Sequence, residues 1–173
     1  MKDSSKTGFD RPDWDTYFMI QAYLAKLRAN CLTRQIGAVI VKNNRQISTG
    51  YNGTPSGFPN CYEGGCKRCA DRAKGSIKSG EGLERCICVH AEANAIMQCV
   101  MFGNAGSTKN ATLYSTLSPC IECSKMAITV GIDQVVILTR YAEDGTDILN
   151  QAGVKILEMD SAKLESWIEK LFE

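Results

Sequence analysis

The stretch ATLYSTLSPCIECSKMAITVGIDQVVILT, residues 111–139, decides the fold class of this chain. Residues 111–117 and 134–139 are rich in β-branched and aromatic side chains and predict two strands. Between them, the sequence from Cys120 to about Val130 predicts a helix. Two strands joined by a helix favour a parallel pair in one sheet. The stretch therefore indicates an α/β protein.

The flanking sequence extends this unit to one layered domain. Further helices are predicted at 13–29, 90–102, 144–152 and 161–172, and further strands at 36–42, 46–50 and 154–159. The first two of these strands are joined by Asn43-Asn44 and are expected to form a hairpin. The order of elements predicts a three-layer α/β/α sandwich with a mixed five-stranded sheet that is parallel in its later part. We expect a single domain over residues 1–173, with a cysteine-rich insertion at about 60–89.

Composition excludes several classes of protein. Hydrophobic residues make up 44% of the chain and charged residues 23%, as in ordinary globular proteins. The net charge of +1 provides no strong field toward nucleic acid or an anionic membrane, so a polynucleotide partner is not expected. The first fifteen residues are polar and predict no signal peptide, and no apolar run is long enough to span a membrane. We therefore expect a cytoplasmic location.

One histidine and two cysteines form a candidate metal site. His90 is the only histidine, and Pro119-Cys120-x-x-Cys123 follows further along the chain. A catalytic zinc usually takes three protein ligands and leaves its fourth position to water, and one imidazole with two thiolates satisfies that count. A Cys-x-x-Cys pair at a helix start lets both sulfurs face one ion, and the unpaired N–H groups there stabilise the thiolates. The spacing predicts a catalytic zinc at His90, Cys120 and Cys123.

Glu92 supplies a proton carrier for such a site. Zinc lowers the pKa of its bound water to roughly 7, and the reaction then needs a group that moves protons between water and substrate. Glu92 lies two residues after His90 and is not needed as a ligand. The alternative is an acidic residue that only favours the first turn of its helix.

The composite motif His-x-Glu…Pro-Cys-x-x-Cys is the signature of zinc-dependent nucleobase deaminases. The resemblance is more specific than that signature. CLTRQIGAVIVKNNRQISTGYNGTPSGFPNC, CICVHAEANAI and LYSTLSPCIECSKMAITVGI are similar to the deoxycytidylate (dCMP) deaminase family. The discriminating piece is the loop Gly50-Tyr51-Asn52-Gly53-x-Pro55-x-Gly57, because the whole superfamily shares the zinc signature.

The resemblance implies a cytidine-deaminase-like fold and the hydrolysis of dCMP to dUMP, a cyclic amidine C–N bond cleavage that supplies dUMP for dTMP synthesis. It also implies a homo-oligomer, a hexamer or a dimer, with dCTP and dTTP as candidate regulators. The zinc ligands of the family correspond to His90, Cys120 and Cys123, and its proton carrier corresponds to Glu92.

Three residues are candidates for binding the substrate. Asn52 offers a donor and an acceptor to a sugar or a base edge, although an Asn-Gly turn without a ligand is the alternative. Asn94, one helical turn after His90, could hold the Asn52 loop or the sugar. Tyr141 matches an aromatic position near the substrate in the family, or else serves packing. Candidates for the 5′-phosphate are Arg34, Lys42, Arg140 and the basic residues of 67–74.

Six further cysteines predict a second metal site. They are Cys31, Cys61, Cys66, Cys69, Cys86 and Cys88. In a reducing compartment such a group holds a metal more often than disulfides, and some dCMP deaminases carry an additional zinc that ties this insertion to the core. Which four of the six would bind is open, two ions are conceivable, and a metal-free cluster of thiols is the alternative. Cys99 is expected to be a buried thiol.

Two other functions compete with dCMP deamination. One is a zinc deaminase of another substrate, such as dCTP, cytidine, deoxycytidine or tRNA adenosine. The other is a non-catalytic, zinc-stabilised module that binds nucleic acid through the cysteine-rich insertion. Glu92 and an open metal position favour an enzyme, since such a module needs neither.

Overall fold

The computed structural model describes residues 10–102 and 106–172. The strands are β1 (Gly37–Lys42), β2 (Arg45–Tyr51), β3 (Thr112–Ser115), β4 (Gln134–Ile137) and β5 (Lys155–Glu158). The α-helices are α1 (Trp14–Ala25), α2 (Lys67–Ala73), α3 (Ala91–Met101), α4 (Ile121–Thr129), α5 (Thr146–Gln151) and α6 (Ser161–Glu169). Single 3-10 turns are η2 (Lys26–Arg28), η3 (Cys61–Glu63), η4 (Leu83–Arg85) and η5 (Lys170–Phe172).

The strands form one mixed sheet in the order β2-β1-β3-β4-β5. β1 pairs with β2 and with β3 in the antiparallel sense, whereas β3, β4 and β5 are parallel. The predicted five-stranded sheet and its parallel later part are both confirmed. The β1–β2 hairpin is confirmed as well, because Asn43 and Asn44 adopt positive φ angles of 52° and 55°, as a tight hairpin turn requires.

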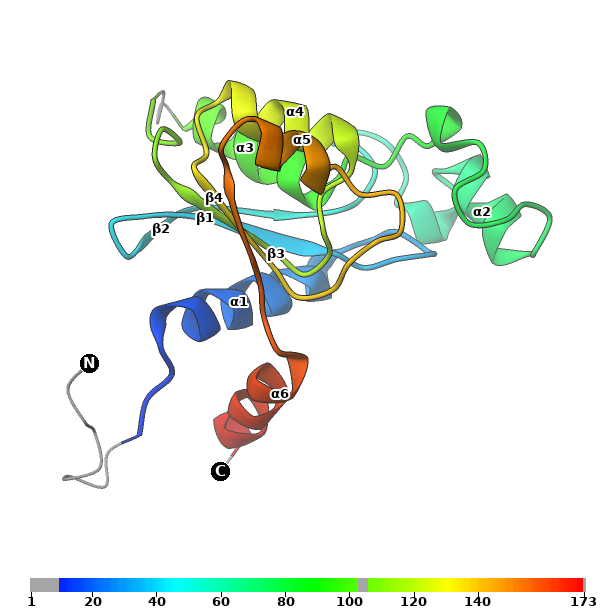
Figure 1. Cartoon of the computed structure of the whole chain (residues 1–173). Helices are drawn as coiled ribbons and strands as arrows, with labels where there is room; N and C mark the ends of the chain where they lie inside the picture. Colours follow the sequence, from blue (N-terminus) through cyan, green and yellow to red (C-terminus); the bar gives the residue numbers. More distant parts are fainter. Residues whose placement is uncertain (1–9, 103–105, 173) are drawn as a thin grey trace.

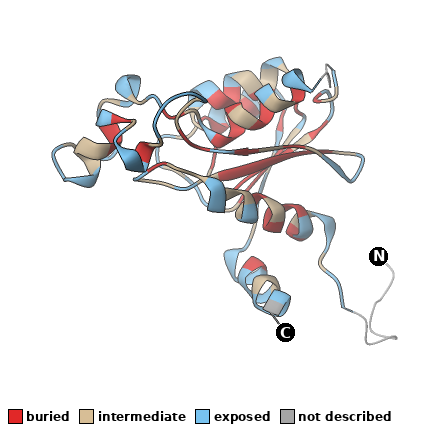
Figure 2. Cartoon of the chain, turned by 180° about the vertical axis from the view of Figure 1, so that it is seen from behind, coloured by how far each residue is buried: buried red, intermediate tan, exposed pale blue. Residues whose placement is uncertain are grey.

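Helices cover both faces of the sheet, so the three-layer α/β/α sandwich is confirmed (Figure 1). Side chains alternate along β1: Ala38 and Ile40 pack toward α3, α4 and α5, and Val39 and Val41 pack toward α1 and α6. Figure 2 shows the buried residues concentrated in the sheet and on the inner sides of these helices. The core is therefore divided by the sheet into two apolar layers.

Two glycines in the hairpin let helices lie directly on the sheet. A Cβ atom on Gly50 would lie 2.0 Å from the Ala91 carbonyl oxygen and 2.5 Å from the Ala95 amide nitrogen. A Cβ atom on Gly37 would meet α1 at the same distances, 2.0 Å from Ala22 O and 2.5 Å from Lys26 N. Close contact at Gly50 fixes the first turn of α3 against β2.

The cysteine-rich segment is the main departure from the predicted elements. The sequence of 60–89 shows no useful periodicity, yet the structure has η3, α2 and η4 there. α2 is only seven residues long and is anchored by two buried side chains, Arg68 and Cys69, rather than by an apolar stripe. An isolated bridge between Gly53 and Val89 ties the end of this segment to the core.

Helix ends differ from prediction by a few residues. The helix predicted to reach Ala29 stops at Ala25 and continues as η2. In residues 10–102 and 106–172, no helix is long and apolar enough to cross a membrane.

Candidate metal centre and active site

His90, Cys120 and Cys123, predicted as one ligand set, come together at the starts of two helices. His90 is the N-cap of α3 and Cys120 is the N-cap of α4. The three ligand atoms lie within 4.8 Å of one another. The His90 Nδ1 atom is 3.3 Å from Cys120 Sγ and 3.5 Å from Cys123 Sγ. Nitrogen and sulfur ligands on a tetrahedral zinc lie about 3.6 Å apart, so these side chains fit that ion.

Of the three side chains, Cys120 is the one whose surroundings favour the negatively charged form. Hydrogen bonding from Cys123 and from His90 lowers the pKa of Cys120 well below that of a free thiol. The same contact with Cys120 raises the pKa of His90. The unpaired N–H groups of the first turn of α4 also favour negative charge at Cys120. A thiolate is therefore available there, as a metal ligand must be.

Glu92 lies beside this ligand set but outside it. Its side chain is 3% exposed and lines the same pocket as His90 and Cys120. The Ser115 hydroxyl, at the end of β3, donates a hydrogen bond of 2.9 Å to Glu92 Oε1. Burial raises the pKa of Glu92 above that of an ordinary glutamate. One carboxylate oxygen is thus held in place, and the other remains available to carry a proton.

Asn52 and Tyr141 line the same pocket, which has a volume of about 110 Å³. Asn52 Oδ1 accepts from the Ile36 amide and Asn52 Nδ2 donates to the Arg34 carbonyl, both at 2.8 Å. The Tyr141 ring stacks under the Arg34 guanidinium at 4.5 Å. Asn52 is therefore fixed by the chain and keeps one N–H and one lone pair for a ligand.

Asn94 is not among the residues that line the pocket. Its Nδ2 atom donates a hydrogen bond of 2.8 Å to the Tyr51 carbonyl, at the end of β2. Of the two roles predicted for Asn94, it has the contact needed to hold the loop.

Three arginines supply positive charge to the pocket: Arg34, Arg68 and Arg72. The other predicted phosphate candidates lie outside the lining, and Arg140 pairs with Glu158 at 2.7 Å. Arg68 is 5% exposed, and its guanidinium donates to the Glu81 carbonyl at 2.8 and 3.0 Å. In the described part of the chain it makes no ion pair.

Sequence reasoning missed Ser115 and Ser79. Ser115 was identifiable as a polar residue near the carboxyl end of the strand predicted at 111–117, and sites of α/β proteins gather at such ends. Ser79 receives a 3.3 Å hydrogen bond from Arg34 across the pocket. No sequence signal marks Ser79, because this contact depends on the path of the insertion.

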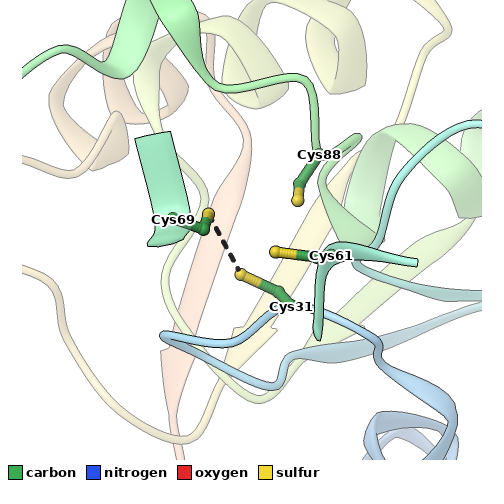
Figure 3. A group of neighbouring side chains, drawn as sticks. All are labelled: Cys31, Cys61, Cys69 and Cys88. Carbon is green, nitrogen blue, oxygen red and sulfur yellow. Dashed lines mark hydrogen bonds between the residues drawn. The ribbon is translucent and has the colours of Figure 1, made fainter. Parts of the chain in front are cut away.

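The six remaining predicted ligands form one buried cluster next to the pocket. Two groups of four could each hold an ion, namely Cys31, Cys61, Cys69 and Cys88, and Cys66, Cys69, Cys86 and Cys88. Figure 3 shows the four sulfurs of the first group pointing toward one another. All nine cysteines of the chain lie in its described part, and none forms a disulfide. Cys99 is a buried thiol of α3, as predicted.

An imidazole and two thiolates at helix starts over a mixed sheet place the protein in the class of α/β proteins with a three-ligand metal site. The family model for the cytidine and deoxycytidylate deaminase zinc-binding region matches residues 12–139. The chain belongs to this family, and its fold is cytidine-deaminase-like.

Named relatives are similar over most of the chain. The deoxycytidylate deaminase of Schizosaccharomyces pombe is 44% identical over 148 residues, which cover 84% of this chain and 44% of that protein. The deoxycytidylate deaminase of Mycobacterium phage D29 is 42% identical over 73% of this chain and 94% of its own length. The chain spans less than half of the yeast relative and nearly all of the phage relative.

A solved structure is also similar to this chain over most of its length. The dCMP deaminase of cyanophage S-TIM5, in complex with dCMP and dUMP, superposes with a TM-score of 0.70 at 32% identity. The match covers 87% of this chain and 100% of the phage chain.

Proposed function

We propose that this chain catalyses the zinc-dependent hydrolytic deamination of dCMP to dUMP. The observation that carries the proposal is Glu92, a buried carboxylate that lines one pocket together with His90 and Cys120 of the three-ligand metal set. Relatives named deoxycytidylate deaminase and a neighbour solved with dCMP and dUMP support this choice of substrate.

His90, Cys120 and Cys123 would hold the catalytic zinc. When bound by one imidazole and two thiolates, zinc lowers the pKa of a water in its fourth position to near neutrality. His90 and Cys120 line the pocket and Cys123 is buried behind it, so a zinc held by the three would be reached from the pocket.

Glu92 would move the protons of the reaction. Ser115 holds Oε1, so Oε2 accepts a proton from the attacking water and delivers it to N3 of the cytosine ring. A second transfer from the same carboxyl group protonates the departing amine. The C4–N bond breaks, a C4–O bond forms, and ammonia leaves. Burial raises the pKa of Glu92, and this direction favours the protonated carboxyl group from which the second transfer starts.

The remaining pocket residues would bind the nucleotide. Asn52 offers its free N–H and lone pair to the deoxyribose or the base, and Tyr141 offers a ring face. Asn94 would act indirectly by holding the Tyr51 carbonyl and with it the Asn52 loop. Arg34, Arg68 and Arg72 provide cations for the 5′-phosphate.

A second zinc in the cysteine cluster would tie the insertion to the core. Its support is the four-sulfur group of Cys31, Cys61, Cys69 and Cys88, which draws on both parts of the chain. Structural zinc sites of four cysteines are closed to water and stabilise the fold directly.

The assembly and its regulation remain proposals drawn from the family. A homo-oligomer, a dimer or a hexamer, is supported by exposed apolar residues at the end of α3: Met97, Val100, Met101 and Phe102. Analytical ultracentrifugation tests the oligomer, and a monomer at micromolar concentration would contradict it.

Regulation by dCTP and dTTP predicts that these nucleotides change the rate of dCMP deamination at subsaturating dCMP. The cytoplasmic location stays a prediction.

The direct test of the function is a comparison of substrates. The zinc-loaded protein is incubated with dCMP, CMP, deoxycytidine, dCTP and a tRNA, while loss of cytosine absorbance and formation of inosine are followed. The expected result is the highest kcat/KM for dCMP. Faster turnover of dCTP or deoxycytidine would replace the proposed substrate, and no turnover of any substrate would contradict an enzyme.

A further inference from the structure

We propose that the six-cysteine cluster holds two zinc ions bridged by Cys69 and Cys88, in addition to the catalytic ion. This goes beyond a single structural zinc and brings the total to three ions per chain. It does not depend on the deaminase activity, because it concerns ligands outside His90, Cys120 and Cys123.

The two possible ligand groups overlap. Each group contains four thiols whose sulfurs lie within 4.8 Å of one another, and Cys69 and Cys88 belong to both. Two ions that each need four thiolates can be satisfied by six cysteines only if two of them are shared. The overlap supplies the two shared ligands that a bridged pair requires, with Cys31 and Cys61 terminal on one ion and Cys66 and Cys86 terminal on the other.

The spacing of the cysteine sulfurs matches that of ligands on a shared zinc ion. With Zn–S bonds of about 2.3 Å, two sulfurs on one tetrahedral zinc lie about 3.8 Å apart. Cys69 Sγ is 3.7 Å from Cys31 Sγ and 3.8 Å from Cys86 Sγ, and Cys66 Sγ is 3.9 Å from Cys86 Sγ. The Cys69 sulfur is thus at the distance expected for two ligands of one zinc from both Cys31, in the first group, and Cys86, in the second group. Figure 3 shows its sulfur directed at Cys31.

A single ion would leave two of the six cysteines without a metal. If only the first group bound zinc, Cys66 and Cys86 would remain as free thiols next to the zinc ligands. Cys66 would then be an unused thiol in a buried position, since it is 1% exposed. If only the second group bound zinc, Cys31 and Cys61 would be left over, at 6% and 0% exposure. A bridged pair uses all six.

The net charge of the cluster is the same with two zinc ions as with one. One zinc with four thiolates carries a net charge of −2. Adding an ion of charge +2 and two more thiolates leaves this net charge unchanged, so the second ion adds no buried charge. Arg68, which is buried on α2 between Cys66 and Cys69, lines one pocket with four of the six cysteines, so a cation lies near a cluster that stays negative.

The two ions would have different roles in the fold. Cys31 follows η2 in the core and Cys61 begins the insertion, so the first ion ties the two together. Cys66 begins α2 and Cys86 follows η4, so the second ion closes the insertion on itself. The cluster thereby fixes α2, the helix that presents Arg68 and Arg72 to the pocket.

The test is a count of metal ions in the protein purified without chelator, by elemental analysis and native mass spectrometry. We expect three zinc ions per wild-type chain. Cys66→Ser and Cys86→Ser should each retain two, and Cys69→Ser should retain one, because it removes a ligand of both cluster ions. Cys99→Ser, a buried cysteine outside both groups, is the matched control and should retain three. Two zinc ions in the wild type, with Cys66→Ser also at two, would overturn the proposal, as would iron in the cluster.

A second measurement needs no variant. In wild-type protein loaded with cadmium-113, two cluster resonances should both correlate with the Hβ protons of the same two cysteines. Cadmium resonances that share no cysteine would overturn the bridge. Inactivity toward dCMP with three zinc ions present would contradict the proposed function and leave the bridged pair standing.

Discussion

Replacing Gly50 by alanine tests whether the position of α3 sets the activity. The new Cβ atom would lie 2.0 Å from Ala91 O and must move to at least 3.0 Å, so the first turn of α3 has to recede by about 1 Å. That turn directly follows His90 and contains Glu92. The displacement therefore falls on the end of the helix that carries a metal ligand and the proton carrier.

The expected magnitudes follow from that shift. Overpacking of this kind costs about 1–3 kcal/mol of stability, which lowers Tm by roughly 2–12 °C in a chain of this size. A misplacement of about 1 Å at a reacting group can cost about 100-fold in rate. We expect Gly50→Ala to lower kcat/KM for dCMP by about 100-fold with its zinc retained.

Gly37→Ala is the matched control, because its Cβ atom meets α1 at the same distances on the opposite face of the sheet. The pocket lining contains no residue of α1, so this variant should lose a similar amount of Tm while kcat/KM stays within about threefold of wild type. Thermal unfolding, zinc content and initial rates well below Tm are measured for both. Equal loss of activity in the two variants, or wild-type activity in Gly50→Ala, would refute the reasoning.

Three further predictions test other contacts. Ser115→Ala removes the bond that orients Glu92 and should lower kcat about tenfold with KM unchanged, so a change confined to KM would count against it. Arg72→Gln should raise KM about 10- to 100-fold for dCMP but not for deoxycytidine, which lacks the phosphate, and equal effects on both substrates would exclude the phosphate contact. Burial and the hydrogen bond that the Tyr114 hydroxyl donates to Asp15 raise the pKa of Tyr114 above 10. The contribution of this hydroxyl to the free energy of unfolding is therefore full at pH 7–9 and falls as the pH rises beyond 10. In denaturant unfolding at pH 8, Tyr114→Phe should therefore be less stable than wild type by about 1.5–3 kcal/mol. This difference in the free energy of unfolding should shrink as the pH rises above 10. A difference that grows there would contradict the prediction.

The sheet and most helices could be predicted because their signals are local. In 111–139, β-rich runs and helix-start residues mark each element within a few positions, and the structure places strands at both ends. α2 could not be predicted, because its stability comes from contacts distant in sequence. Arg68 binds the Glu81 carbonyl and Cys69 lies in the cysteine cluster, and neither contact leaves a periodic pattern.

The candidate site likewise contains residues that could be predicted from the sequence and residues that could not. His-x-Glu and Cys-x-x-Cys are short motifs whose ligands are oriented by single helix starts, so the sequence was sufficient to predict that they meet. The arginines could not be chosen from the sequence, because Arg34 and Arg72 line the same pocket only once the insertion has folded. The bond from Asn94 to Tyr51 likewise depends on how α3 lies on β2.

The most direct test of the account is the rate of dUMP formation from dCMP by wild-type protein and by Glu92→Gln. Glutamine keeps the shape of the side chain and can still accept the Ser115 hydrogen bond, but it cannot carry the proton. With equal zinc content and similar Tm, the account predicts that the variant is at least about 100-fold slower in kcat. A variant that forms dUMP at close to the wild-type rate, or a wild-type protein that forms none, would contradict it.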